Sequence, residues 1–362
     1  MRKMIILLII ISALTICVRG VELPDQWDGT IDAEKMMDKI PERAEKYLGK
    51  QISPQIDFAE DAMNIFSDTI SQSGGYIKTS LALILKICLI IILCKLTEAG
   101  NWTSMGHSVS LAGVLAMTVC CAADFRTMIG LGKSTMEELV DFSTVLIPVM
   151  ASAAAATGSA TGAGVLYGVT ILFSRILIGL CGYVLLPGVY AYLALGVADA
   201  SMRQDRLKKI REFLSWTMHS LLKWMMYAFT GFVTLSGILA GSVDAMAIKA
   251  AKLTLSGVVP VVGGIISDAA ETILYSAGIM KSAIGTFGML ALLAVFLSPF
   301  LRMGIHYLAL KLTGALCGIV GSVLCGYVEC ITNAMGFLLA MLGSCIVMCL
   351  LSCCCFMRFV GV

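Results

Sequence analysis

Long apolar runs separated by short polar segments dominate the chain from residue 79 to its end. The clearest runs cover 80–96, 106–123, 164–198, 213–240, 282–298, 299–316 and 334–356. Most of them approach or exceed the roughly 20 apolar residues with which an α-helix crosses a bilayer. The pattern predicts an all-α polytopic membrane protein with about eight transmembrane segments, in a range of roughly six to ten. We assign this membrane domain to residues 79–362.

The first 20 residues have the pattern of a signal peptide. Arg2 and Lys3 precede an apolar run that ends before the small residue Gly20. A basic start, a short apolar stretch and a small residue at the end are typical of a secretory signal. An uncleaved membrane anchor is the alternative.

Residues 21–78 form an acidic segment of different character, with twelve Asp and Glu against six Lys and Arg. Apolar residues recur there at helical spacing, with interruptions at Pro41 and Pro54. This predicts short amphipathic helices that lie outside the cytoplasm. They either pack on the membrane domain or dock an extracytoplasmic partner.

Charge sets the expected orientation of the membrane domain. The loop 198–213, ADASMRQDRLKKIREF, holds five Lys and Arg between two apolar runs, so the positive-inside rule places it in the cytoplasm. With residues 21–78 outside, an odd number of crossings must separate the two segments. The run 164–198 would be about 52 Å long as one helix, and we expect it to break at Pro187.

Four prolines share one spacing. They are Pro148, Pro187, Pro260 and Pro299. Pro148 and Pro187 are 39 residues apart, and so are Pro260 and Pro299. The second pair follows the first by 112 residues. This predicts helix breaks at the four prolines and a parallel internal repeat, about 137–248 and 249–360.

The stretch 145–164, VLIPVMASAAAATGSATGAG, has few large side chains after its proline. Small residues let helix backbones approach closely, which is the main packing device inside a membrane. The residues that we expect to pack tightly are Ala154, Gly158, Gly162, Gly263 and Gly264. A pore-lining or cavity-lining role is the alternative.

Two charged residues are candidate intramembrane functional groups. Arg175 lies near the centre of an apolar run, where a cation costs at least about 2.5 to 3.5 kcal/mol on insertion scales. We therefore expect Arg175 to face protein or water, with Glu329 as its candidate partner.

Enzyme chemistry has no recognisable motif in this sequence, which contains neither HExxH nor GxxxxGK[ST]. Cys345, Cys349 and Cys353 share one helix face without a CxxC pair or a nearby histidine, so packing is favoured over a metal or thiol site. We predict no catalytic, cofactor or metal site. The net charge of +2 does not favour nucleic acid as a partner.

Several stretches together resemble one known family. They are SQSGGYIKTSLALILKICLIIILCKLTEAG, VLIPVMASAAAATG, the basic loop and VVPVVGGIISDAAETI. With the signal sequence and the acidic segment, they are similar to stage III sporulation protein AE of endospore-forming bacteria. The resemblance implies a multi-pass subunit, in the mother-cell membrane around the forespore, of a secretion or feeding channel between the two cells. Its implied partners are a cytoplasmic ATPase and ring proteins between the two membranes. A stand-alone secondary transporter, a non-conducting scaffold and a homo-oligomer remain open.

Overall fold

Long helices make up nearly all of the described structure. The computed structural model describes residues 39–49, 58–99, 106–154, 160–202, 207–238, 283–320 and 324–360. The α-helices are α3 Glu42–Leu48, α4 Phe58–Gln72, α5 Gly74–Ala99, α6 Gly106–Ala154, α7 Ala160–Leu180, α8 Leu186–Met202, α9 Lys208–Ile238, α12 Ala283–Val320 and α13 Cys325–Val360. A π-helix, η2 Cys181–Leu185, joins α7 to α8. The described residues contain no strand, which confirms the predicted all-α class.

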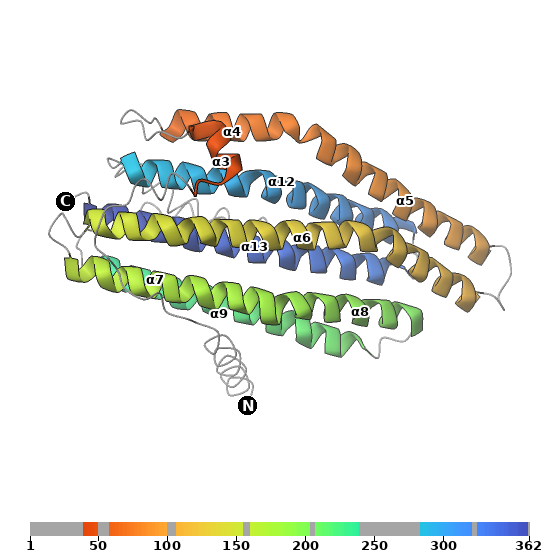
Figure 1. Cartoon of the computed structure of the whole chain (residues 1–362). Coiled ribbons are helices and arrows are strands. Elements are labelled where there is room, and N and C mark those ends of the chain that lie inside the picture. Colours follow the sequence, from red (N-terminus) through yellow and green to blue (C-terminus); the bar gives the residue numbers. More distant parts are fainter. Residues whose placement is uncertain are drawn as a thin grey trace.

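The long helices lie side by side and run alternately in opposite directions (Figure 1). α5, α8 and α12 end, and α6, α9 and α13 begin, at one end of the bundle. We call the half at this end the basic half, because α9 begins there with Lys208, Lys209 and Arg211. The opposite half, where α6 and α13 end, is called the acidic half. The acidic helices α3 and α4 pack against α12 in that half.

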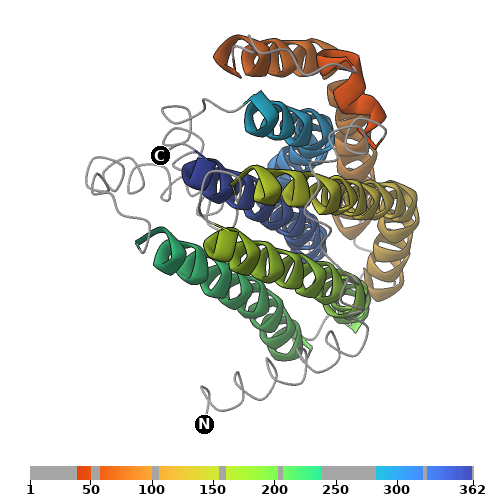
Figure 2. The same ribbon diagram turned by 60° about the vertical axis from the view of Figure 1, so that its left-hand side comes forward.

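α13 is the central helix of the bundle. It packs against α12, α6, α9 and α8, and Figure 2 shows it between α12, α6 and α9. Its thiols at Cys345, Cys349 and Cys353 are buried, so they occupy the core as small apolar side chains.

Five of the described helical stretches are long and apolar enough to cross a membrane. They are Gly74–Thr97, Leu111–Ala151, Tyr167–Met202, Ile284–Ile319 and Cys325–Met357. The number is lower than the predicted eight partly because the runs 282–298 and 299–316 belong to one helix, α12. Residues 145–154 likewise continue α6. Residues 239–282 lie outside the described part of the chain.

Proline does not break these helices as predicted. Pro148 and Pro299 lie inside continuous α-helices, where neighbouring helices hold the chain despite one missing backbone hydrogen bond. At Pro187 the helix also continues, through the π turn of η2, in which the Leu186 N–H donates to the Cys181 carbonyl. The wider turn accommodates the proline ring. The predicted break at Pro187 is therefore a local widening.

Some sequence predictions fall where the structure gives no description. Pro260, Gly158, Gly263 and Gly264 lie outside the described residues, and the surroundings of Ala154 and Gly162 are not described either. The second copy of the predicted repeat begins in the same region. The repeat is not confirmed, and tight packing at these five small residues stays a prediction.

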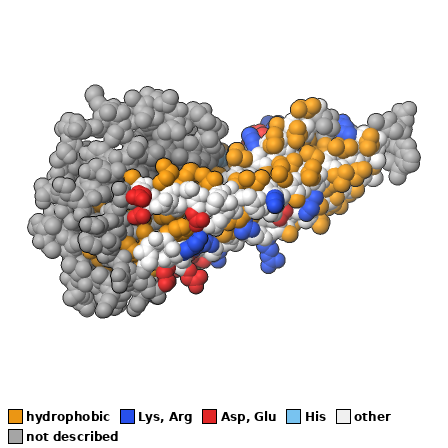
Figure 3. Space-filling view, turned by 90° about the horizontal axis from the view of Figure 1, so that it is seen from above, with side chains coloured by type: hydrophobic (Ala, Val, Ile, Leu, Met, Phe, Trp, Pro, Cys, Tyr) orange, Lys and Arg blue, Asp and Glu red, His pale blue; other side chains and the backbone are white. Residues whose placement is uncertain are grey.

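The bundle is much longer than a bilayer is thick. α6 has 49 residues, which corresponds to about 73 Å, against roughly 30 Å of hydrocarbon. Large exposed apolar side chains gather in the basic half: Leu81, Leu85, Leu89, Leu93 and Leu96 of α5, Leu111, Leu115 and Val119 of α6, and Leu308, Leu312, Leu316 and Ile319 of α12. In Figure 3, hydrophobic side chains cover much of the basic half, and most of the visible acidic side chains lie toward the acidic half. The surface favours the basic half as the part inside the bilayer.

One acidic side chain joins α3 to α4. Asp68 accepts hydrogen bonds from Tyr47 Oη at 2.6 Å, Gln72 Nε2 at 2.7 Å and Lys46 Nζ at 3.0 Å. The hydrogen bond from Tyr47, followed by those from Lys46 and Gln72, lowers the pKa of Asp68 from 3.8 to about 2. The ionised carboxylate therefore stabilises the contact of α3 with α4.

We expect this contact to weaken in acid. Because the pKa of Asp68 is lower in the folded chain, its stabilisation is complete above the ordinary value of 3.8 and is lost as the pH falls toward about 2. Hydrogen exchange of the α3 amides, corrected for the intrinsic rate at each pH, should show protection that declines across this interval. Asp68→Asn should give weak protection with no such step. An equal step in this variant would assign the change to another group.

Candidate functional site in the basic half

The two predicted intramembrane charges do not meet. Glu329 is exposed near the start of α13, in the basic half. Arg175 is exposed on α7, about 40 Å along the helix from the end of α8 at 1.5 Å per residue. α8 ends at the same end of the bundle where α13 begins (Figure 1), so the residue spacing places Arg175 and Glu329 at different levels of the bundle. The predicted pairing is wrong, and Arg175 lies on the surface of the acidic half.

We therefore expect Arg175→Leu to leave membrane abundance and sporulation close to the wild-type level. The exposed guanidinium has no ion pair among the described residues, and a surface side chain of this kind contributes little to stability. Immunoblots of membrane fractions and counts of heat-resistant spores provide the two measurements. A severe loss in either would assign Arg175 to a contact with a partner.

A buried ion pair links α8 to α9 in the basic half. Arg211 Nη2 lies 3.6 Å from Asp199 Oδ2, and the side chains are only 15% and 7% exposed. Asp199 Oδ1 has no hydrogen-bond partner among the described residues. The pair holds the two helices on either side of the basic loop. Because the pair is buried, loss of either side chain would leave the other charge without a partner in the protein interior.

Polar contacts also join α8 to α13 at this level. Cys330 Sγ lies 3.7 Å from the Tyr192 carbonyl oxygen, to which it donates, and Asn333 Nδ2 lies 3.5 Å from Tyr192 Oη. Gly196 brings the helices close together, because a Cβ atom there would lie 2.2 Å from Cys330 Sγ and 3.2 Å from its Cβ. A side chain at Gly196 therefore fits only if the Cys330 side chain moves away from α8.

Close packing of this kind recurs at glycines that the sequence prediction does not include. A Cβ at Gly288 would lie 2.6 Å from a methyl carbon of Leu146, and one at Gly285 would lie 2.6 Å from Met357 Cγ. Both contacts join α12 to another helix of the core. Small residues therefore do let helices approach closely in this bundle. In these cases they are single glycines that contact large side chains of the neighbouring helix.

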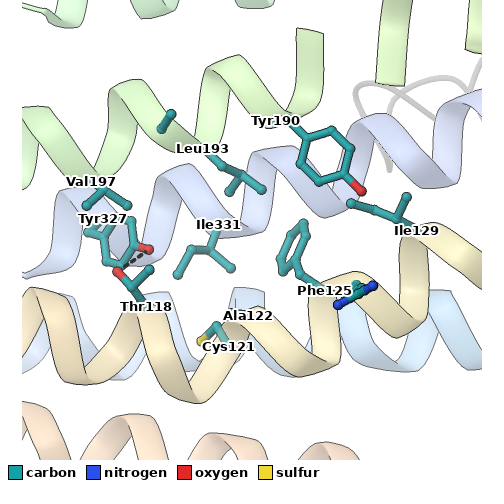
Figure 4. Close-up of a pocket in the computed structure, with 12 residues that line it drawn as sticks. Thr118, Cys121, Ala122, Phe125, Ile129, Tyr190, Leu193, Val197, Tyr327 and Ile331 are labelled. Atoms are coloured by element: carbon teal, nitrogen blue, oxygen red, sulfur yellow. Dashed lines mark hydrogen bonds between the residues drawn. The ribbon is translucent and has the colours of Figure 1, made fainter. Parts of the chain in front are cut away.

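A pocket of about 580 Å³ lies between α6, α8 and α13 beside these contacts (Figure 4). Its lining residues are Thr118, Cys121, Ala122, Phe125, Arg126 and Ile129 of α6, Tyr190, Leu193, Ala194 and Val197 of α8, and Tyr327 and Ile331 of α13. The volume is within the usual range of small-ligand sites. Most of the lining is apolar.

The two ends of the pocket differ in polarity. At one end the hydroxyl groups of Thr118 and Tyr327 are hydrogen-bonded to each other at 2.7 Å. Toward the other end lie Tyr190 and Ile129 (Figure 4), and Arg126 precedes Ile129 by three residues on α6. The pocket can therefore hold an apolar group along its length and an anion beside Arg126.

The sequence contained a usable signal for part of this site. Asp199 is a lone acidic residue at the end of a long apolar run, and Arg211 follows across the basic loop. Their spacing could have suggested a hairpin ion pair. Arg126 had no such signal, because nothing in the sequence indicates which helices surround it. No group of three metal-ligating side chains occurs within the described ranges.

Comparison with known proteins gives one consistent result. A family described as stage III sporulation protein AE matches residues 47–358 of the chain. A Bacillus subtilis (strain 168) protein, "Stage III sporulation protein AE", is 19% identical over 254 residues, which cover 70% of this chain and 63% of that protein. The chain thus aligns with less than two thirds of its relative. No solved structure matches significantly.

Proposed function

Because the chain belongs to the stage III sporulation protein AE family, we propose that it is an integral membrane subunit of a multiprotein channel between mother cell and forespore. Membership of the family, which confirms the resemblance seen in the sequence, gives it a role in sporulation. We place it in the mother-cell membrane around the forespore. Its partners in this proposal are a cytoplasmic ATPase and ring proteins between the two membranes.

One observation carries the proposal: a single helical bundle has an apolar surface in one half and charged surface in the other. Helices of about 55 to 73 Å cannot be covered by roughly 30 Å of hydrocarbon, so part of the bundle must project from the membrane. A subunit that joins proteins on two sides of a membrane needs such a projection. A permease confined to the bilayer does not.

The distribution of charge supports one orientation. α5, α6 and the α7–η2–α8 helix make three passes between the acidic helices α3 and α4 and the start of α9. An odd number of passes agrees with a basic loop in the cytoplasm and an acidic segment outside it. In this orientation the ATPase meets the basic end, and the acidic half faces the ring proteins.

Affinity purification from sporulating cells tests the proposal. The full-length chain, tagged at its C-terminus and extracted in mild detergent, should retain an ATPase and the ring proteins, identified by mass spectrometry. The same preparation from vegetative cells that express the chain ectopically is the control. Solute flux through liposomes that contain this chain alone would support a stand-alone transporter. A complete complex that conducts nothing would support a scaffold.

A further inference from the structure

We propose that the pocket between α6, α8 and α13 binds an anionic phospholipid, with one acyl chain along the pocket and the phosphate at Arg126. The proposal concerns the bilayer around the bundle, so it does not depend on the channel role. It rests on the lining of the pocket, on its length and on the position of its single cation.

The lining favours an apolar chain over a polar solute. Leu193, Val197 and Ile331 line the pocket with Phe125 and Ile129. At the end away from Arg126, the Thr118 and Tyr327 hydroxyls are hydrogen-bonded to each other at 2.7 Å. That end therefore offers no strong hydrogen-bonding group to a polar ligand, and burial of a hydrocarbon chain there is favourable.

The length of the pocket agrees with one leaflet of a bilayer. Its α6 wall extends from Thr118 to Ile129, a rise of about 16 Å at 1.5 Å per residue. Half of the hydrocarbon core is roughly 15 Å thick. The pocket runs along the bundle axis within the basic half, as an acyl chain in the adjoining leaflet does.

Arg126 has the position and chemistry to bind the headgroup. It lies about 30 Å from the start of α6 at Gly106, which is the full thickness of the hydrocarbon core. It is exposed and has no ion pair among the described residues. Asp124 lies two residues away on the same helix, a spacing at which side chains do not face each other. A planar guanidinium binds phosphate oxygens through paired hydrogen bonds, so an anionic phosphate is the expected occupant.

Native mass spectrometry of the full-length chain, extracted from cell membranes in mild detergent, tests the proposal. The wild-type chain should retain one phospholipid of anionic class. Arg126→Gln should lower its occupancy by roughly tenfold or more, since a charge-assisted hydrogen bond contributes at least about 1.4 kcal/mol. Arg126→Lys should retain part of the lipid. Arg175→Gln removes another exposed guanidinium, outside the pocket, and should leave lipid occupancy unchanged.

A second variant tests the acyl-chain site independently of charge. Ala194 is exposed and lines the pocket, so Ala194→Phe should fill the space while Arg126 remains. Loss of the lipid in this variant, with unchanged helical content by circular dichroism, supports the proposal. Equal lipid in wild type, Arg126→Gln and Ala194→Phe would overturn it. Masses of detergent, free fatty acid or a co-purifying membrane peptide in place of phospholipid would also overturn it.

Discussion

Gly196→Leu is expected to deplete the folded protein from the membrane. A Cβ at this position would lie 2.2 Å from Cys330 Sγ and 3.2 Å from Cys330 Cβ, and leucine adds three more carbon atoms. Rotation of the Cys330 thiol can relieve the contact with Sγ, but the contact with Cβ and the three added carbon atoms require α8 and α13 to shift apart. Overpacking of this kind costs about 3 kcal/mol, near the upper end of the usual range. Membrane abundance and the melting temperature in detergent measure the effect.

Three further variants separate a steric effect at Gly196 from a general sensitivity of α7 and α8 to larger side chains. Gly168 on α7 is exposed, and a Cβ there would meet nothing within 4 Å. Gly168→Leu should therefore behave like the wild type. Gly196→Ala should be partly rescued by Cys330→Ala, because that change removes the sulfur atom that lies nearest. If Gly196→Leu and Gly168→Leu are equally abundant and stable, the close approach of α8 to α13 is wrong.

Asp199→Leu is expected to have an effect at least as large. It leaves the Arg211 guanidinium, only 15% exposed in the ion pair, without its counter-charge. Removing one member of a buried pair costs about 3 to 5 kcal/mol, whereas replacing both with apolar residues is often neutral. The double variant Asp199→Leu with Arg211→Met should therefore be more stable than either single variant. Thermal unfolding of the four proteins in one detergent gives the comparison.

An exposed ion pair in the same chain provides the control. Lys133 and Glu137 lie 3.7 Å apart on α6, and their side chains are 58% and 54% exposed. Glu137→Gln should change the free energy of unfolding by less than about 0.5 kcal/mol, because solvent screens such a pair. A loss at Asp199 no larger than this would show that the Asp199–Arg211 pair is not buried in the folded protein.

The apolar runs were sufficient to predict the fold class, because a run of this length has few alternatives to a membrane helix. They were insufficient for the number and ends of the helices. Pro148, Pro187 and Pro299 suggested breaks, but packing on neighbouring helices and the π turn at Cys181–Leu185 keep these helices continuous. The effect of a proline depends on contacts that a single helix does not reveal.

The candidate site was harder to predict for a related reason. Arg175 has an apolar sequence on both sides, which suggested the centre of a membrane, yet its helix is longer than the bilayer and continues into the acidic half. When an apolar run is longer than the hydrocarbon core is thick, its sequence does not show how deep a given residue lies in the membrane. The contact of Gly196 with Cys330 joins residues 134 positions apart. Only the arrangement of α8 and α13 brings them together.

The central claim is that the basic half lies in the membrane with its loop in the cytoplasm, while the acidic half projects on the other side. Short epitope tags inserted after Gly49 and after Asp205, each in the full-length chain, test it most directly. In intact protoplasts of vegetative cells that express the chain, antibody should reach the tag after Gly49, and the tag after Asp205 should become accessible only after permeabilisation. Both tags on the same side of the membrane would contradict the account.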